Sequence, residues 1–284
     1  MVFRVEPVAG SLGAVLDGID VRDLDEAGIE TLREHIHTYE VVFLPGQHLD
    51  DDEQLTLGAQ LGPLRGFAFA SVLGGVDDDA PPTLTAIRDS AESPPATDGW
   101  HTDVTWTAEP PDYAVLRAVT VPESGGDTMW ASLTAAYRDL SDTMRRFIDD
   151  LVVVHDNSTF IESVREKMGA EQFEALEIGP KLQAGFPPVH HPLVRTHPDT
   201  GARALFLAGN FMRYVEGLTA AESDNLLGFL AGHLDQHRFH LRWRWHEGDV
   251  VIWDERTTNH RGVSDHFPQE REVRRIEVGG SVPV

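Results

Sequence analysis

The sequence of 284 residues has no cysteine, and among its 23 basic residues only Lys167 and Lys181 are lysines. Without cysteine the chain cannot form disulfide bonds, a thiolate nucleophile, iron–sulfur ligands or a cysteine-type zinc site. It also lacks an apolar run of the roughly 18 residues that a membrane span needs, and its first residues lack the apolar centre of a signal peptide. We therefore expect a cytoplasmic protein that does not bind membranes.

Positive charge is scarce as well, because 47 acidic residues give a formal net charge of −24. A charge of this sign opposes binding to nucleic acid and to anionic lipid. A small organic anion must then be captured by a few individually placed arginines. The content of 41% hydrophobic and 25% charged residues is that of a globular protein, and all-β domains often reach this length. We predict one domain over residues 1–284 that binds a small anionic substrate and assembles as a homo-oligomer.

Short hydrophobic segments with strand-like alternation dominate the chain, while helical spacing is confined to its N-terminal part and to insertions. This order disfavours a regular α/β sheet and predicts a mainly β sandwich or barrel with flanking helices. Residues 26–39 have helical spacing behind Asp25 as N-cap, and the acids of residues 50–53 begin a second helix. Further helices are expected at residues 133–150 and 219–235, and strands at residues 13–19, 41–44, 113–121, 152–155, 191–196, 204–207, 239–245, 250–253 and 274–278.

A charged segment interrupts the predicted strands at about residues 156–188. Its central part, residues 160–183, has a helical pattern, and Gly-Pro and Pro-Pro dipeptides lie near its end. Insertions between core strands often cover binding sites. We predict that this insertion is a lid.

Two histidines and one aspartate form the candidate metal site. His101 and Asp103 are two residues apart, and on a β-strand such residues point to the same face. His260 follows the apolar run of residues 250–253 and is the best third ligand. Non-haem Fe(II) oxygenases use two histidines and one carboxylate, which leave further coordination positions open. An isolated His-x-Asp triplet is also common as a hydrogen bond at a strand end, so the triplet alone does not establish the site.

Two other functional classes could use the same residues. A zinc hydrolase would bind a metal-activated water with His101, Asp103 and His260. A noncatalytic jelly-roll binding protein would keep the fold and lose the metal. The remaining histidine groups lack a suitably spaced acid and are interpreted as structural. Asp254 and Asp265 flank His260 and could orient it by hydrogen bonding, or serve turns.

Several motifs occur in a characteristic order along the chain. They are Gly-Gly-Asp-Thr-Met-Trp at residues 125–130, the segments of residues 191–198 and 242–245, and Ile-Trp-Asp at residues 252–254. Together with the metal-ligand candidates, they resemble the taurine dioxygenase family of Fe(II)/2-oxoglutarate-dependent dioxygenases, from Leu12 to about Gly280. The resemblance implies a double-stranded β-helix, the jelly-roll core. It also implies Fe(II), 2-oxoglutarate and dioxygen as cofactor and co-substrates, and oxidation of an unactivated C–H bond.

The resemblance further assigns two anion sites. Arg271 lies eleven residues after His260, and in the family an arginine at this offset binds the distal carboxylate of 2-oxoglutarate with the threonine of the Gly-Gly-Asp-Thr motif, here Thr128. Arg275 matches the arginine that holds the sulfonate in taurine dioxygenases. On a strand both arginines would share one face. A buried Arg275 requires an anionic substrate or an internal acid, and we favour a substrate anion.

The predicted substrate pocket departs from the taurine-specific pattern. The histidine expected within residues 62–69 is absent, and Thr97 stands where taurine-specific members carry asparagine four residues before the metal histidine. This favours an apolar organic acid, first a natural-product intermediate such as a terpenoid acid; the alternative is an alkylsulfonate or alkyl sulfate, oxidised with release of sulfite or sulfate. The candidate substrate-binding residues, of which the aromatic ones could equally be core residues, are Phe67, Phe69, Thr97, Trp106, Phe160, Phe211 and Arg275.

Overall fold

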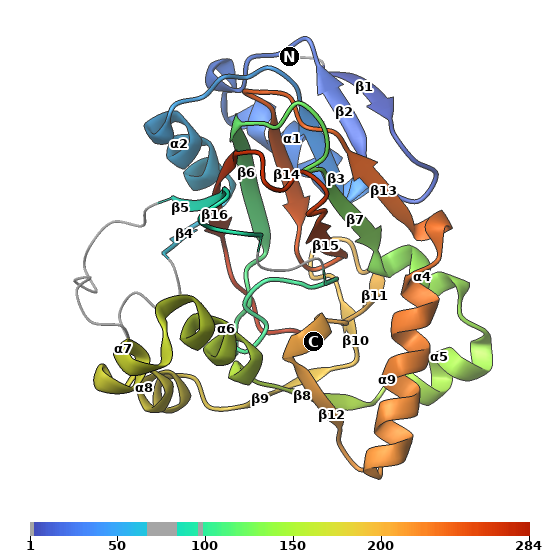
Figure 1. Ribbon diagram of the computed structural model, residues 1–284. Coiled ribbons are helices and arrows are strands. Elements are labelled where there is room, and N and C mark those ends of the chain that lie inside the picture. The colour runs from blue at the N-terminus through green and yellow to red at the C-terminus, as the bar shows by residue number, and fades with distance from the viewer. Residues whose placement is uncertain (1–2, 67–83, 96–98) are drawn as a thin grey trace.

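The computed structural model describes residues 3–66, 84–95 and 99–284. It has the predicted mainly β architecture with helices packed outside the sheets (Figure 1). Within the described residues, no helix is long and apolar enough to cross a membrane.

The largest sheet has eight strands, and most of its neighbouring strands are far apart in the sequence. Only β2 and β3 pair in parallel among the strands described in this sheet. β5 (Thr85–Asp89) pairs with β16 beside the main path. The order along that path is β1 (Arg4–Pro7), β2 (Ala14–Asp17), β3 (Val41–Leu44), β14 (Val250–Asp254), β6 (Tyr113–Thr120), β16 (Arg271–Val278) and β4 (Leu64–Arg65).

A second sheet faces the first and consists of β13 (His240–Trp243), β7 (Thr128–Ser132) and β15 (Thr258–Gly262). Phe43, Trp130 and Trp253 belong to a hydrophobic cluster formed by side chains from both sheets. Val42 and Leu44, on the opposite face of β3, belong to the cluster under the outer helices. Both faces of β3 are therefore buried, which explains its uninterrupted apolar sequence.

Two N-terminal helices, α1 (Glu26–Tyr39) and α2 (Asp51–Leu61), contribute to the cluster on the outer face of the large sheet. Asp25 caps α1 by accepting a hydrogen bond from the Gly28 amide, as predicted. Asp50 and Glu53 form a capping box at the start of α2. Both caps satisfy amide groups that have no partner within the helix, so these helix starts are set locally by the sequence.

One predicted helix is broken into two. Residues 133–150 form α4 (Leu133–Asp139) and α5 (Asp142–Ile148). Leu140 is extended, and the Ser141 hydroxyl accepts a hydrogen bond from the Met144 amide. Serine at this position caps a new helix instead of continuing the old one, so the prediction of a single helix was wrong.

Two smaller sheets occupy the lower half of the molecule in Figure 1. A three-stranded sheet and a two-stranded sheet lie there, with the long helix α9 (Ala220–Leu234) beside them. Short 3-10 turns occur at η1 (Val21–Asp23), η2 (Gly209–Phe211) and η3 (His237–Phe239). The strands of the two smaller sheets are β12 (Met212–Val215), β8 (Val152–His155) and β9 (Val189–Pro192), and β10 (Val194–Thr196) with β11 (Arg203–Leu205).

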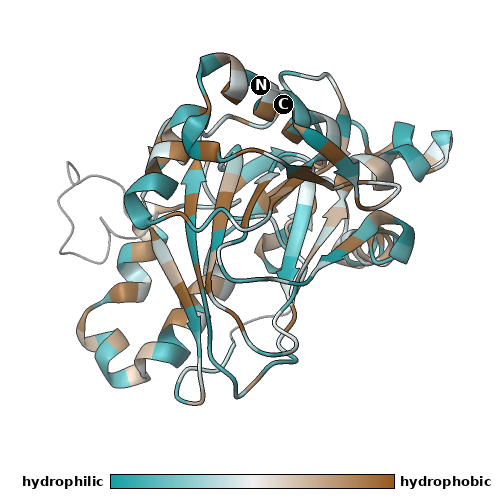
Figure 2. Ribbon diagram, turned by 90° about the horizontal axis from the view of Figure 1, so that it is seen from above, coloured by the Kyte–Doolittle hydropathy of each residue, from teal (hydrophilic) through white to brown (hydrophobic). Residues whose placement is uncertain are grey.

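The predicted insertion at residues 156–188 is helical and forms three short helices, α6 (Ser158–Met168), α7 (Ala170–Ala175) and α8 (Ile178–Gly185). Figure 2 shows hydrophobic and hydrophilic segments alternating along the outer helices, as expected of helices that bury one side. The buried side of α6–α8 packs around Trp106. The role of this insertion as a lid stays a prediction.

Candidate active site

The fold brings the three predicted metal ligands together. The His101 Nε2 atom lies 3.7 Å from one carboxylate oxygen of Asp103, and the His260 Nε2 atom lies 3.8 Å from the other. One ligand atom from each residue lies within 4.8 Å of the other two. Two imidazoles and a carboxylate around one point can hold a divalent metal ion and leave further positions open.

Asp103 is positioned by a turn and not by the predicted strand. Only His101 takes part in strand-like pairing, through a bridge to His260 with N···O distances of 3.0 and 2.8 Å. Residues 103–106 form a turn in which Val104 has φ of 54°, a left-handed conformation that is rare for β-branched residues. The strand prediction was therefore wrong here, because a turn of the chain, and not strand alternation, places His101 and Asp103 together.

Hydrogen bonds fix both the loop and the imidazole of His101. The Nδ1 atom of His101 lies 2.9 Å from the Gly99 carbonyl, so Nδ1 carries the proton and Nε2 is left as the ligand atom. The Thr102 hydroxyl donates to the Thr258 carbonyl at 3.1 Å, and the Asn259 amide donates to the Thr102 hydroxyl at 2.7 Å. These bonds connect the metal-binding turn to β15, the strand that carries His260.

Glu255 is a buried carboxylate behind the metal site that the sequence analysis missed. Its Oε2 atom accepts the backbone N–H of Asp103 at 3.2 Å, and its Oε1 atom accepts the indole N–H of Trp253 at 2.7 Å. Oε1 lies 3.9 Å from the Nδ1 atom of His260, which makes no hydrogen bond within the described residues. Burial and the neighbouring Asp103 carboxylate raise the pKa of Glu255 well above its usual range. The sequence feature that could have pointed to Glu255 is its position directly after the Ile-Trp-Asp motif.

The two aspartates that flank His260 have other partners. Asp254 lies 2.9 Å from His197 and 2.7 Å from Arg256. Asp265 accepts hydrogen bonds from the Gly126 amide and from Arg242, both at 3.0 Å. Both aspartates therefore join loops to the core, and Glu255 lies behind His260 in their place.

The protonation states of the site suit metal binding. Burial raises the pKa of Asp103. The nearby Arg275 and the two imidazoles together lower it by more than burial raises it, so the pKa of Asp103 lies below its ordinary range. Burial, together with the nearby His101, lowers the pKa of His260 to about 3. At neutral pH the carboxylate is ionised and the His260 imidazole is neutral, as a metal ion requires of its ligands.

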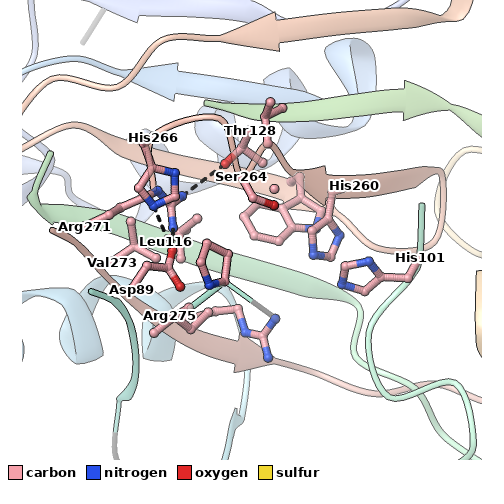
Figure 3. A pocket seen from close by; sticks show the side chains of 15 residues that line it. Asp89, His101, Leu116, Thr128, His260, Ser264, His266, Arg271, Val273 and Arg275 are labelled. Carbon is pink, nitrogen blue, oxygen red and sulfur yellow. Dashed lines mark hydrogen bonds and ion pairs between the residues drawn. The ribbon is translucent and has the colours of Figure 1, made fainter. Parts of the chain in front are cut away.

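A cavity of about 160 Å³ extends from His101 and His260 to Arg271 (Figure 3). The guanidinium of Arg271 donates to the Gly126 carbonyl at 2.9 Å and to the Thr128 hydroxyl at 3.4 Å. Arg271 comes from β16 and Thr128 from β7, so two facing sheets supply the pair. The structure thus brings together the arginine and the threonine that were predicted to bind one carboxylate.

Arg275 also lines this cavity, but internal acids already surround it. Its guanidinium donates to Asp103 at 2.5 Å and lies 3.1 Å from Glu277. Arg274 is directed elsewhere and pairs with Asp51 and Glu272. The predicted inward direction of Arg275 and outward direction of Arg274 are confirmed, and the partners of Arg275 in this structure are carboxylates of the protein.

The predicted aromatic lining divides into two groups. Trp106 and Phe211 pack with Phe160 of α6 in one cluster, and the ring centroid of Trp106 lies 4.4 Å from that of Phe211 and 5.4 Å from that of Phe160. None of these three is among the described residues that line the cavity between His101 and Arg271, and the buried Trp106 has the alternative role of a core residue. Phe67, Phe69 and Thr97 lie outside the described residues.

Comparison with known proteins covers nearly the whole chain. A family model described as the taurine catabolism dioxygenase TauD, TfdA family matches residues 4–276. An alpha-ketoglutarate-dependent sulfate ester dioxygenase of Pseudomonas putida is 37% identical, with 99% of this chain and 90% of the relative covered. An alkylsulfatase of Acinetobacter baylyi is 33% identical, with 99% and 86% covered. The crystal structure of a taurine dioxygenase from Burkholderia xenovorans has a TM-score of 0.80 at 33% identity, covering 99% of this chain and 92% of that chain.

These matches confirm the predicted fold class, because the structural neighbour is a dioxygenase with the jelly-roll fold and has a similar course over almost the full length. They also decide between the three functional classes that the metal-binding residues left open. The family is one of oxidising enzymes, and neither a hydrolase mechanism nor a noncatalytic role is needed to account for the site. The chain belongs to the taurine catabolism dioxygenase TauD, TfdA family and is a non-haem Fe(II)- and 2-oxoglutarate-dependent dioxygenase.

Proposed function

We propose that this enzyme oxidises an alkyl sulfate ester, with Fe(II) held by His101, Asp103 and His260. The donor set fits the ion, because an ionised carboxylate and two imidazoles with Nε2 atoms turned inward surround one point. Bound Fe(II), with 2-oxoglutarate and dioxygen, supplies the oxidising power needed for an unactivated C–H bond. Arg271 and Thr128 would bind the distal carboxylate of 2-oxoglutarate.

The observation that carries the substrate proposal is the position of Arg275. Its guanidinium lies beside Asp103, which places any anionic group that it binds close to the reacting centre. A divalent ion bound to Asp103 would compete with Arg275 for that carboxylate and free part of the guanidinium. A planar guanidinium pairs well with two oxygens of a sulfate group.

The relatives support sulfate esters as the chemical class of the anion. The sulfate ester dioxygenase and the alkylsulfatase are similar over 99% of this chain, and their names specify sulfate esters or alkyl sulfates. These similarities favour the alternative of the sequence analysis over the natural-product acid that it placed first. Without the polar residues typical of taurine-specific members, we expect the enzyme to prefer an alkyl chain to the aminoethyl group of taurine.

The reaction balances without a further reactant. Hydroxylation of the carbon that bears the ester oxygen yields an unstable hydroxy sulfate, which breaks at the carbon–oxygen bond to give an aldehyde and sulfate. One 2-oxoglutarate and one dioxygen are consumed, and one succinate, one carbon dioxide and one proton are formed. The role of this chain's side chains is to hold the ester with its C–H bond directed at the metal.

A panel of sulfur-containing anions tests the proposal. The purified enzyme with Fe(II) and 2-oxoglutarate should release sulfate and succinate in equal amounts from hexyl and octyl sulfate. We expect kcat/KM for taurine and for a terpenoid carboxylic acid to be lower by about 100-fold, since their anionic or apolar groups fit only in part. Efficient succinate formation coupled to taurine or to the terpenoid acid would show that the substrate proposal is wrong.

Arg275 and its neighbour Arg274 provide a matched pair of variants. Arg275→Met should raise KM for hexyl sulfate by about 30-fold or more, because a buried anion loses a charged partner. Arg274→Met should leave KM close to wild type, since Arg274 pairs with Asp51 and Glu272 outside the cavity. If the two variants raised KM for hexyl sulfate equally, Arg275 would not be a substrate-binding residue.

A further inference from the structure

We propose that His266 is a second binding residue for the distal carboxylate of 2-oxoglutarate and acts together with Arg271. This inference rests on the proposed co-substrate site at Arg271 and Thr128. His266 lies between β15 and β16 and lines the same cavity as both residues. Figure 3 shows it beside Arg271, at the end of the cavity opposite His101 and His260.

The imidazole of His266 is buried and lacks a hydrogen bond. The residue is only 2% exposed, and within the described residues neither ring nitrogen has a hydrogen-bond partner. The carboxylate of Asp89 lies 3.4 Å from Nε2 as an ion-pair contact. A buried donor without a hydrogen bond costs free energy unless a ligand satisfies it. An incoming carboxylate in this cavity would satisfy it.

The charge around Arg271 gives a second reason. The same carboxylate oxygen of Asp89 lies 3.6 Å from the Arg271 guanidinium. One guanidinium and one carboxylate have no net charge, so a ligand carboxylate placed there gains little from Arg271 and is repelled by Asp89. An N–H of His266 supplies the additional donor that a second anion in this region needs.

The backbone holds His266 and Arg271 against each other. Gly126, with φ of 70°, packs so closely that a Cβ atom at this position would lie 3.0 Å from Cδ of Arg271 and 3.3 Å from Cγ of His266. The second glycine of the Gly-Gly-Asp-Thr motif therefore leaves the space in which both side chains lie. Both then reach the end of the cavity, one from strand β16 and one from the preceding loop.

A purely structural role is the competing interpretation, in which His266 only ties its loop to β5 through Asp89. A ligand that lacks the distal carboxylate separates the two. 2-Oxopentanoate has the same five-carbon chain as 2-oxoglutarate, with a methyl group in place of that carboxylate. A residue that binds the carboxylate affects 2-oxoglutarate alone, whereas a residue that only supports the loop affects both ligands.

The experiment is calorimetric titration of the Mn(II)-loaded full-length enzyme, without substrate, with each of these two oxo acids. His266→Phe removes both ring nitrogens and should weaken 2-oxoglutarate binding by at least about tenfold, the usual effect of losing a hydrogen bond to a charged group. His266→Gln keeps an N–H donor and should weaken it less. Both variants should bind Mn(II) and 2-oxopentanoate within about twofold of wild type.

The control variant is His246→Phe, which removes an exposed histidine that also faces an aspartate, with Nδ1 3.6 Å from Asp249 and 75% of the side chain exposed. It should not change either affinity. Wild-type binding of 2-oxoglutarate by His266→Phe, or a parallel loss of both ligands, would overturn the proposal. Failure of the wild-type enzyme to distinguish 2-oxoglutarate from 2-oxopentanoate would instead overturn the co-substrate site at Arg271 itself.

Discussion

Glu255 is the residue whose position explains most about the metal site. It accepts hydrogen bonds from the Asp103 amide and the Trp253 indole, and its carboxylate faces Nδ1 of His260. Residues that contact metal ligands in this way set ligand orientation and basicity. One buried carboxylate thus supports two of the three ligands, while the Gly99 carbonyl supports His101.

We predict that Glu255→Gln weakens Mn(II) binding by about 10- to 100-fold. Both oxygens of the Glu255 carboxyl group accept N–H groups here, so an amide must turn its own N–H₂ toward one of these donors. Calorimetric titration of Mn(II) measures the effect, with Glu40→Gln as a control at a buried glutamate outside the metal site. Wild-type affinity in Glu255→Gln would mean that Glu255 does not position the ligands.

The helices of the insertion, α6–α8, pack against the metal-binding turn. Ile161, Phe173 and Leu182 from these helices pack in one cluster with Trp106, which lies three residues after Asp103. A movement of the helices would therefore reach the turn through Trp106. This contact is compatible with the predicted lid and gives it a route to the site, and closure on substrate stays a prediction.

The end of helix α1 contains a group that makes stability depend on pH. Glu40 follows the helix with φ of 64°, is 7% exposed, and burial raises the pKa of its carboxyl group to about 8. A neutral Glu40 in the folded state keeps a proton that the unfolded chain releases above about pH 4.5. Its stabilising contribution is therefore complete below that pH and is lost as the pH rises toward 8.

Glu40→Gln should consequently unfold with nearly the wild-type free energy at pH 5 and be more stable than wild type at pH 8. The gain at pH 8 should be on the order of 3 kcal/mol, because one pKa unit corresponds to about 1.4 kcal/mol. Urea unfolding at the two pH values measures it. A difference between the two proteins that does not change with pH would contradict the buried neutral carboxyl group.

For the whole molecule, the metal site gathers acidic groups in an already acidic protein. The Asp103 carboxylate and the buried carboxyl groups of Glu255 and Glu277 lie near Arg275, and burial raises the pKa of both glutamates, in a chain with a formal net charge of −24. A divalent cation that binds the folded state alone stabilises it by mass action. The homo-oligomeric state that we expect from the sequence stays a prediction.

We predict that Mn(II) at about 100 times its dissociation constant raises Tm by about 5 °C, since such binding contributes about 2.7 kcal/mol. Mg(II), which prefers oxygen ligands, should have a smaller effect at the same concentration. Differential scanning calorimetry of wild type and His101→Ala tests this. A shift of equal size in His101→Ala would indicate that the metal stabilises the protein at another place.

The sequence by itself determined the features that depend on residues within about four positions of each other. The caps at Asp25 and Asp50, the buried strand Val41–Leu44 and the helix α9 follow from side chains next to the backbone groups that they satisfy or bury. The motif order and the family resemblance also predicted the three candidate metal ligands and the pair Arg271 and Thr128, and the structure brings the members of each set together.

Only the tertiary structure decided which distant side chains meet. Arg275 pairs with Asp103 across 172 positions of the sequence, and Glu255 bonds Asp103 across 152. His266 faces Asp89 because β5 pairs with β16 in a register that sets Asp89 opposite Arg271. Strand register and the turn at Val104 fix these contacts, and both result from packing of the whole core, which local periodicity does not encode.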